Sequence, residues 1–107
     1  MRRVLFICTQ NLLRSPTAEE IFSGRAGIEV ASAGLAPDAA TPVSTELLEW
    51  ADLIFVMEKA HRNKLTRQFR TSLKGKRIIC LDIPDQYGFM DPVLVQLLEE
   101  KIGQFLG

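Results

Sequence analysis

The chain has 107 residues, of which 47% are hydrophobic, and its 13 Lys and Arg residues balance 13 Asp and Glu residues. This composition is typical of one small globular domain, so we expect a single domain over residues 1–107. The longest uncharged apolar run, Val4 to Cys8, is far shorter than the ~18 residues of a membrane span, and no leader pattern is seen. Two cysteines and one histidine argue against a disulfide framework and a Cys/His zinc site. We therefore expect a cytoplasmic protein that does not contact membranes.

Short apolar runs alternate with helical patterns along the chain. The predicted elements are a strand over 3–9, a helix over 16–24, a strand over 28–32, a helix over 42–50, a strand over 53–56, a helix over 59–69, a strand over 77–81 and a helix over 92–105. Strands that alternate with single helices indicate parallel pairing through right-handed crossovers. The sequence thus predicts an α/β fold, a three-layer doubly wound sheet with helices on both faces. In such sheets ligands bind beyond the carboxyl ends of the strands, which directs attention to the loop after the first strand.

That loop carries Cys8 and, six positions later, Arg14, with Ser15 and Pro16 fitting the cap and first residue of the following helix. A loop of this length can curl so that its N–H groups point inward, and the helix behind it adds the positive end of its dipole. Arginine offers a planar fork for two oxygens, and several donors around a cysteine favour thiolate over thiol. Each residue alone would be ordinary, but the pair at this spacing predicts an oxyanion site. The predicted phosphate-binding loop consists of Cys8, Thr9, Gln10, Asn11, Leu12, Leu13, Arg14 and Ser15.

The chemistry expected of this loop is phosphoryl transfer to sulfur. A thiolate beneath a bound phosphate can attack phosphorus in line with the leaving oxygen, and water can later hydrolyse the cysteinyl phosphate. Inorganic phosphate or sulfate is also expected to occupy the loop. Asn11 has a separate task, because a sharp curl needs a residue that tolerates positive φ.

The stretch from Val4 to Glu19 resembles the opening of the low-molecular-weight protein tyrosine phosphatases, in a short variant. Residues 31–34 resemble the second strand and turn of that family, and residues 51–58 its third strand. The resemblance implies a four-stranded parallel sheet, with the order 2-1-3-4, and no cofactor. It also implies roles for four residues: Cys8 as nucleophile, Arg14 clamping the phosphate, Ser15 hydrogen-bonding the thiolate and Asn11 holding the loop. Gln10 departs from the usual glycine, and Leu13 from a common second cysteine.

The reaction also needs a carboxylic acid that protonates the leaving oxygen. Asp91 and Pro92 repeat the Asp-Pro pair of the family's acid loop, yet they also fit a helix cap followed by proline at the first helical position. Asp85 lies in the loop directly after the fourth predicted strand, two residues before Tyr87, and the family's tyrosine stacks on the substrate ring. We favour Asp85 as the acid and keep Asp91 as the alternative. Tyr87 is either a substrate contact or a half-buried loop aromatic.

The remaining residues receive structural interpretations. We expect Cys80 to be a core residue beyond disulfide reach of Cys8, His61 to be solvated and Trp50 to pack in the core. Eight basic residues and no acid lie between Lys59 and Arg77. This stretch is either a solvated face or a docking surface for an anionic partner such as an acidic phosphoprotein, and the lack of interleaved aromatics argues against nucleic acid.

The sequence therefore predicts a phosphatase that hydrolyses phosphotyrosine or another aryl phosphate monoester, in a phosphorylated protein or a small molecule. Gln10 and the two candidate acids motivate a first alternative, a catalytically weak module that binds phosphate or phosphoproteins. A second alternative is an arsenate reductase, although the chain lacks a third cysteine for a relay. A third is a phosphocarrier similar to the IIB components of sugar phosphotransferase systems, which lack the arginine that closes this loop.

Overall fold

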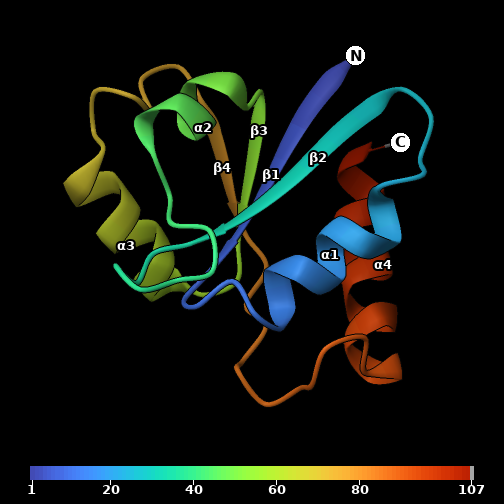
Figure 1. Ribbon diagram of the computed structural model, residues 1–107. Coiled ribbons are helices and arrows are strands. Elements are labelled where there is room, and N and C mark those ends of the chain that lie inside the picture. The colour runs from blue at the N-terminus through green and yellow to red at the C-terminus, as the bar shows by residue number, and fades with distance from the viewer. Residues whose placement is uncertain (107) are drawn as a thin grey trace.

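The computed structural model describes residues 1–106. In chain order its elements are β1 (Arg2–Cys8), α1 (Arg14–Phe22), β2 (Ile28–Gly34), α2 (Thr45–Trp50), β3 (Leu53–Val56), α3 (Lys59–Gln68), β4 (Arg77–Cys80) and α4 (Pro92–Leu106). The four strands pair in parallel in the order β2-β1-β3-β4. Helices α1 and α4 cover one face of the sheet, and α2 and α3 the other (Figure 1). The predicted fold class and strand order are confirmed.

Strand β1 lies inside the sheet and is buried on both faces. Val4, Phe6 and Cys8 enter the core beneath α1 and α4, whereas Leu5 and Ile7 enter the core beneath α2 and α3. This explains why the strand is an unbroken apolar run rather than an alternating one. Burial of one such side chain contributes roughly 1.5–3 kcal/mol, so the end of β1 is held firmly.

The connection from β2 to α2 differs from the sequence prediction. Strand β2 continues to Gly34 instead of ending at residue 32, because it pairs with β1 as far as Cys8. Pro42 then forms an isolated parallel bridge with Gly34 and is not helical. Helix α2 begins only after Ser44, whose hydroxyl oxygen accepts a hydrogen bond from the Leu47 N–H at 3.2 Å.

The start of α1 also differs from the prediction. The helix begins at Arg14 and has no side-chain cap, so Ser15 lies inside its first turn rather than capping it. The Ser15 hydroxyl is therefore available for other contacts. Trp50 packs against the core beneath α2 and α3, as predicted.

The carboxyl ends of the parallel strands meet at one edge of the sheet, at the bottom of Figure 1. The loops after β1, β3 and β4 leave the sheet at this edge (Figure 1). Within residues 1–106, no helix has both the length and the apolar character needed to cross a lipid bilayer.

Candidate active site

The loop between β1 and α1 is held by the segment that follows β2. Three carbonyl oxygens of the loop accept hydrogen bonds from backbone N–H groups of that segment. The Cys8 carbonyl accepts from Leu35 at 3.0 Å, the Thr9 carbonyl from Ala36 at 2.9 Å and the Gln10 carbonyl from Ala40 at 3.0 Å. Within residues 1–106, no N–H group of residues 9–15 donates a backbone hydrogen bond. Because the carbonyls are turned outward, the amides of the loop are available to an anion, as in a backbone nest.

The close approach of these two segments requires glycine at position 34. A Cβ atom there would lie 2.6 Å from the Thr9 carbonyl oxygen and 2.9 Å from the Asn11 nitrogen. Both contacts are shorter than real Cβ atoms make, and both neighbours are backbone atoms that cannot swing away. Asn11 itself has φ of 59°, as its sequence context predicts.

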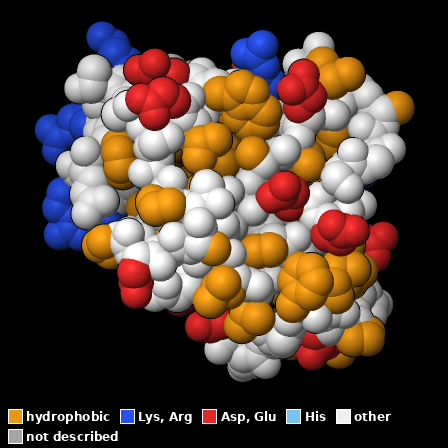
Figure 2. All heavy atoms as spheres, viewed as in Figure 1, with side chains coloured by type: hydrophobic (Ala, Val, Ile, Leu, Met, Phe, Trp, Pro, Cys, Tyr) orange, Lys and Arg blue, Asp and Glu red, His pale blue; other side chains and the backbone are white. Residues whose placement is uncertain are grey.

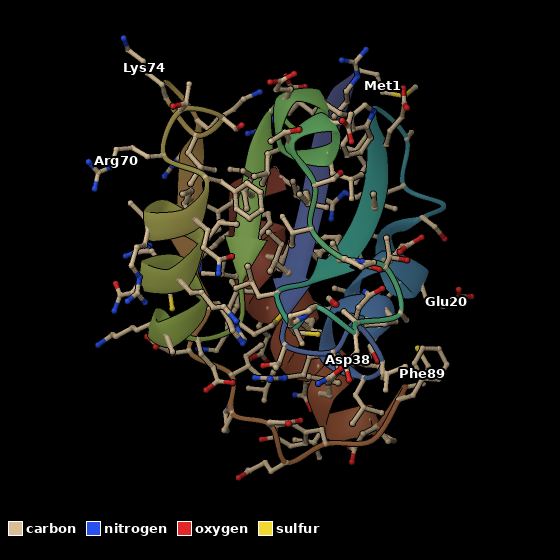
Figure 3. All side chains as sticks on the ribbon, turned by 60° about the vertical axis from the view of Figure 1, so that its left-hand side comes forward. Met1, Glu20, Asp38, Arg70, Lys74 and Phe89 are labelled. Atoms are coloured by element: carbon tan, nitrogen blue, oxygen red, sulfur yellow. The ribbon has the colours of Figure 1, made fainter. Side chains whose placement is uncertain are left out.

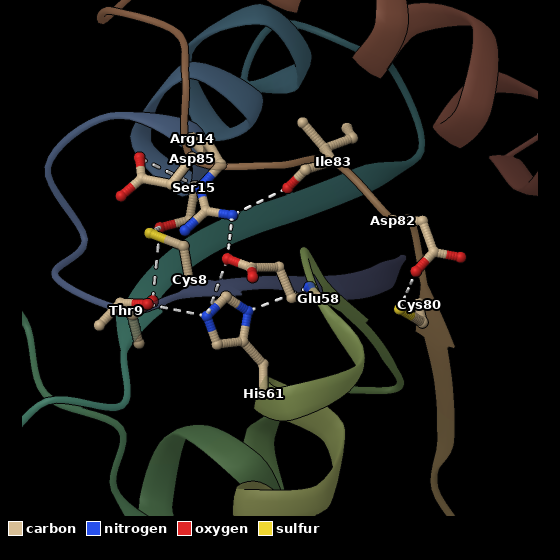
Figure 4. A network of polar contacts seen from close by, with 11 residues as sticks. Cys8, Thr9, Arg14, Ser15, Glu58, His61, Cys80, Asp82, Ile83 and Asp85 are labelled. Carbon is tan, nitrogen blue, oxygen red and sulfur yellow. Dashed lines mark hydrogen bonds and ion pairs between the residues drawn. The ribbon is translucent and has the colours of Figure 1, made fainter.

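Cys8 and Ser15 form the floor of the loop. The Cys8 side chain is 3% exposed, and its Sγ lies 2.9 Å from the Ser15 Oγ (Figure 4). The other acceptor within reach of the Ser15 hydroxyl, the carbonyl of Ala33, is farther away at 3.4 Å. The Ser15 proton is therefore best directed at the sulfur of Cys8.

A chain of polar side chains orients this hydroxyl. The Asn11 Nδ2 donates to the Ser15 Oγ and to the Ser32 Oγ, both at 2.9 Å, and the Ser32 hydroxyl donates to a Glu19 carboxylate oxygen. Because an amide nitrogen can only donate, the Ser15 oxygen acts as an acceptor toward Asn11 and its proton stays free for Cys8. The sequence did not single out Ser32 or Glu19, which join the loop only through tertiary contacts.

Arg14 is 2% exposed and is fixed along one side of its guanidinium group. Its Nη1 donates to the Glu58 Oε2 at 2.5 Å and to the Ile83 carbonyl oxygen at 2.8 Å (Figure 4). Its Nε lies 3.8 Å from the Asp85 Oδ1, and its Nη2 makes no hydrogen bond within residues 1–106. The Nε and Nη2 edge can therefore take two oxygens of one oxyanion.

His61 was predicted to be solvated, and that prediction is wrong. The side chain is 7% exposed, and its Nδ1 accepts a hydrogen bond from the Glu58 N–H at 3.1 Å. The proton therefore resides on Nε2, which donates to the Thr9 Oγ1 at 2.9 Å. Burial lowers the pKa of His61 below its ordinary 6.5, and the positive charge of Arg14 lowers it further. A neutral His61 thus supports the phosphate-binding loop through Thr9.

This arrangement makes stability depend on pH. We expect the free energy of unfolding to fall as pH drops from 6.5 through the lower pKa of folded His61, because the unfolded chain binds the proton first. Above pH 6.5 the imidazole is neutral in both the folded and the unfolded chain, so His61 does not make the free energy of unfolding depend on pH there. The loss should be roughly 1.4 kcal/mol for each pH unit that separates the two pKa values. Urea unfolding at pH 7.5 and about 5.5 should show a smaller change for His61→Gln than for the wild type; equal changes would contradict this account.

The phosphate-binding loop borders a pocket of about 340 Å³. The pocket is lined by Cys8, Thr9, Gln10, Leu12, Leu13, Arg14 and Asp85. Asn11 and Ser15 are buried behind this lining and act on it through hydrogen bonds. The volume is at the lower end of the range for small-molecule sites, which suits a phosphate group with one ring attached.

The two candidate acids occupy different places. The Asp85 side chain is 62% exposed at the pocket, near Arg14. The Asp91 Oδ1 accepts a hydrogen bond from the Val93 N–H at 2.8 Å and so caps α4. Tyr87 does not line the pocket but packs, half-buried, against the core beneath α4.

Cys80 lies at the end of β4, and β3 separates that strand from β1. Its Sγ contacts the Asp82 Oδ1 at 3.5 Å, and burial raises the pKa of this thiol. Neither cysteine forms a disulfide. A thiol in this state is a poor nucleophile, so the geometry gives Cys80 no part in a cysteine relay.

The basic stretch between residues 59 and 77 forms α3 and the turn before β4. Three of its side chains are used structurally: Arg62 donates to the Ile78 carbonyl, Lys76 to the carbonyls of Glu49 and Ala51, and Arg77 lies over the Phe105 ring. No lysine or arginine of this stretch forms an ion pair within residues 1–106. Arg70 and Lys74 project into solvent at the end of the molecule opposite Asp38 and Phe89 (Figure 3). An anionic docking role for this face stays a prediction.

Comparisons with known proteins agree with this geometry. Residues 3–41, which include the whole phosphate-binding loop, match the family model of low molecular weight phosphotyrosine protein phosphatases. Vibrio vulnificus Wzb, solved in complex with benzylphosphonate, is 26% identical, with 97% of this chain and 96% of that chain covered and a TM-score of 0.77. A low molecular weight protein tyrosine phosphatase from T. tengcongensis is 26% identical, with coverages of 96% and 94% and a TM-score of 0.73.

A third solved structure shares the fold at lower identity. The YwlE arginine phosphatase from Geobacillus stearothermophilus is 21% identical, with 99% of this chain and 93% of that chain covered and a TM-score of 0.79. No curated protein matches the chain by sequence. Together the comparisons show that residues 3–41 are similar to the low molecular weight phosphotyrosine protein phosphatases and that the whole chain shares the fold of such proteins. The names of these proteins include both tyrosine and arginine phosphatases.

Proposed function

On the premise that this chain is a relative of the low-molecular-weight protein tyrosine phosphatases, we propose that it hydrolyses aryl phosphate monoesters, with phosphotyrosine in proteins as the substrate class. One observation carries the proposal: Cys8 lines the same pocket as Arg14, which has an open edge, and as loop residues whose N–H groups donate no backbone hydrogen bond within residues 1–106. Such a ring of donors fits the three terminal oxygens of a phosphate monoester.

In the first step the Cys8 thiolate attacks phosphorus. Its electron pair forms the S–P bond while the bond between phosphorus and the aryl oxygen breaks. Asp85, at the mouth of the pocket, gives its proton to the departing oxygen, so that a neutral phenol leaves. The loop amides and Arg14 hold the three remaining phosphoryl oxygens and stabilise their charge in the transition state.

In the second step water hydrolyses the cysteinyl phosphate. The Asp85 carboxylate takes a proton from the water molecule as its oxygen attacks phosphorus, and the S–P bond breaks. The electron pair returns to the Cys8 sulfur, where the Ser15 hydroxyl stabilises it. Ester and water are thereby converted into phenol and inorganic phosphate, and Asp85 is protonated again for the next cycle.

Hydrolysis of phenyl phosphate tests this function and its acid together. We expect Asp85→Asn to lower kcat by about 10²-fold or more on phenyl phosphate, because the amide cannot protonate a poor leaving group. The loss on p-nitrophenyl phosphate should be smaller, since p-nitrophenolate leaves without a proton. Asp91→Asn is the matched control and should stay near wild-type activity, because asparagine also caps helices well.

The outcomes separate the function from the assignment of the acid. A wild-type protein that hydrolyses neither ester would contradict the phosphatase proposal. A larger loss in Asp91→Asn than in Asp85→Asn would move the acid to the second aspartate. Peptides that carry phosphotyrosine or phosphoarginine decide the substrate, and we expect the higher kcat/KM on phosphotyrosine.

The apolar edge of the pocket supports an aryl substrate. Leu12 and Leu13 line the pocket and are 59% and 38% exposed, so they can cover the faces or edges of a ring. For Tyr87 we retain contact with the leaving group as a prediction, because it follows Asp85 by two residues.

The chemistry also bears on the location of the protein. Both cysteines are free thiols, and the proposed mechanism requires Cys8 to remain reduced. Reducing conditions of this kind are typical of the cytoplasm, which we propose as the compartment in which the protein acts.

A further inference from the structure

Apart from Met1, all large hydrophobic side chains that residues 1–106 expose belong to two segments, the loop before α1, which lines the pocket, and the residues around the start of α4. They are Leu12 (59%), Leu13 (38%), Phe89 (54%), Met90 (37%) and Val93 (54%). We call these five residues the apolar rim. Figure 2 shows hydrophobic side chains over much of this face, among them a group on its lower part, where the loop before α4 passes below α1 (Figures 1 and 2). Single exposed apolar residues are ordinary, but a contiguous group marks an interaction site.

Two hydrogen bonds join the segments of the rim. The Met90 N–H donates to the Thr17 Oγ1 at 3.0 Å, and the Thr17 hydroxyl donates to the Leu13 carbonyl oxygen at 2.6 Å. Met90 has φ of 60°, a conformation that a residue with a side chain adopts only when its surroundings impose it. Phe89, beside it, points away from the body of the molecule (Figure 3). The fold therefore presents the α4 side of the rim next to the phosphate-binding loop.

We propose that the apolar rim binds large apolar side chains that flank the phosphorylated residue of a protein substrate, an inference that rests on the proposed function. The pocket itself accommodates a phosphate and one ring, and its lining ends at Leu12 and Leu13. Phe89, Met90 and Val93 lie outside that lining, so a free aryl phosphate would leave them uncovered. A polypeptide that continues on either side of the phosphorylated residue can cover them.

The charges near the rim restrict this partner further. From Leu81 to Glu100 the chain carries five acidic residues and no lysine or arginine. Among them, Asp85 is 62% exposed at the pocket. Acidic residues that flank the phosphorylated position would therefore be repelled, and the rim selects segments with apolar or basic flanks.

Two peptides with a non-hydrolysable phosphonate analogue of phosphotyrosine test the proposal. They are identical except that one carries leucines and the other serines on both sides of the analogue, and fluorescence anisotropy measures their dissociation constants. We expect the wild type to bind the leucine peptide at least ~10-fold more tightly, because partial burial of two or more apolar side chains is worth that much. The double variant Phe89→Ser, Val93→Ser should bind both peptides within about 2-fold of each other.

The control variant Arg70→Ser, Lys74→Ser removes two exposed long side chains at the opposite end of the molecule and should keep the wild-type preference. Equal binding of the two peptides by the wild type would overturn the proposal, and so would a preference that survives in the double variant or binding of neither peptide. Turnover of p-nitrophenyl phosphate reports on the proposed function separately. If the wild type hydrolyses p-nitrophenyl phosphate but binds the two peptides equally, only the proposal for the apolar rim is overturned. If the wild type hydrolyses no p-nitrophenyl phosphate but still prefers the leucine peptide, only the proposed phosphatase activity is overturned.

Discussion

Replacement of Cys8 by serine will lower kcat for p-nitrophenyl phosphate by at least about 10⁴-fold, because the nucleophile acts in both chemical steps. Inorganic phosphate should still bind to the variant. The loop amides and Arg14 do not depend on the sulfur, and the smaller oxygen fits the same place beside Ser15. Steady-state kinetics measures the first effect, and isothermal titration with phosphate measures the second.

The same substitution at the other cysteine is the matched control. Cys80→Ser should keep wild-type kcat, because β3 separates β4 from the strand that ends at Cys8. Full activity in Cys8→Ser would contradict the covalent mechanism. Phosphate binding by a wild-type protein that shows no turnover would instead favour a binding module, and a stable phosphorylated Cys8 would favour a phosphocarrier.

Replacement of Arg14 by lysine should lower kcat/KM by about 10²- to 10³-fold, although the charge is kept. The guanidinium bonds Glu58 and the Ile83 carbonyl with one nitrogen and leaves its Nε and Nη2 edge for the phosphoryl group. The single ammonium group of a lysine cannot bond Glu58 and the Ile83 carbonyl and also bind the phosphoryl oxygens in this geometry. The inhibition constant of inorganic phosphate should rise with the loss of activity, because the same edge binds the product.

Arg62→Lys is the control for this exchange. Arg62 also donates to a backbone carbonyl, that of Ile78, but lies on the exposed side of α3. We expect its kinetic constants to match those of the wild type. An Arg14→Lys variant with wild-type kcat/KM would show that the proposed fork does not bind the phosphoryl oxygens.

The parts of the site that could be predicted are those with a local signature. The spacing of Cys8 and Arg14, the unbroken apolar run of β1 and the suitability of Asn11 for positive φ are all visible within fifteen residues of sequence. The alternation of strands and helices likewise predicted the parallel sheet, because crossover connections restrict how such elements can pair.

The contacts that were missed join residues far apart in the chain. Glu58 and His61 reach the loop from 44 and 52 positions away, through Arg14 and Thr9. In the sequence His61 belongs to a strongly polar helix, so its composition indicated solvent exposure. The position of Glu58 and His61 in the chain was the available signal. Both residues follow the carboxyl end of β3, and the loops after the strands of this sheet converge at that edge.

The segment after β2 has a consequence for anyone who modifies this protein. Pro37 and Asp38 are exposed in a connection without regular structure and look like a safe place to insert a tag or a fluorescent domain. Yet the neighbouring N–H groups of Leu35, Ala36 and Ala40 donate hydrogen bonds to the carbonyl oxygens of the phosphate-binding loop. These hydrogen bonds keep the carbonyls turned away from the anion site. A fusion is better placed at Gly75, in the turn before β4, where a Cβ atom added to the glycine would meet no atom within 4 Å outside its chain neighbours.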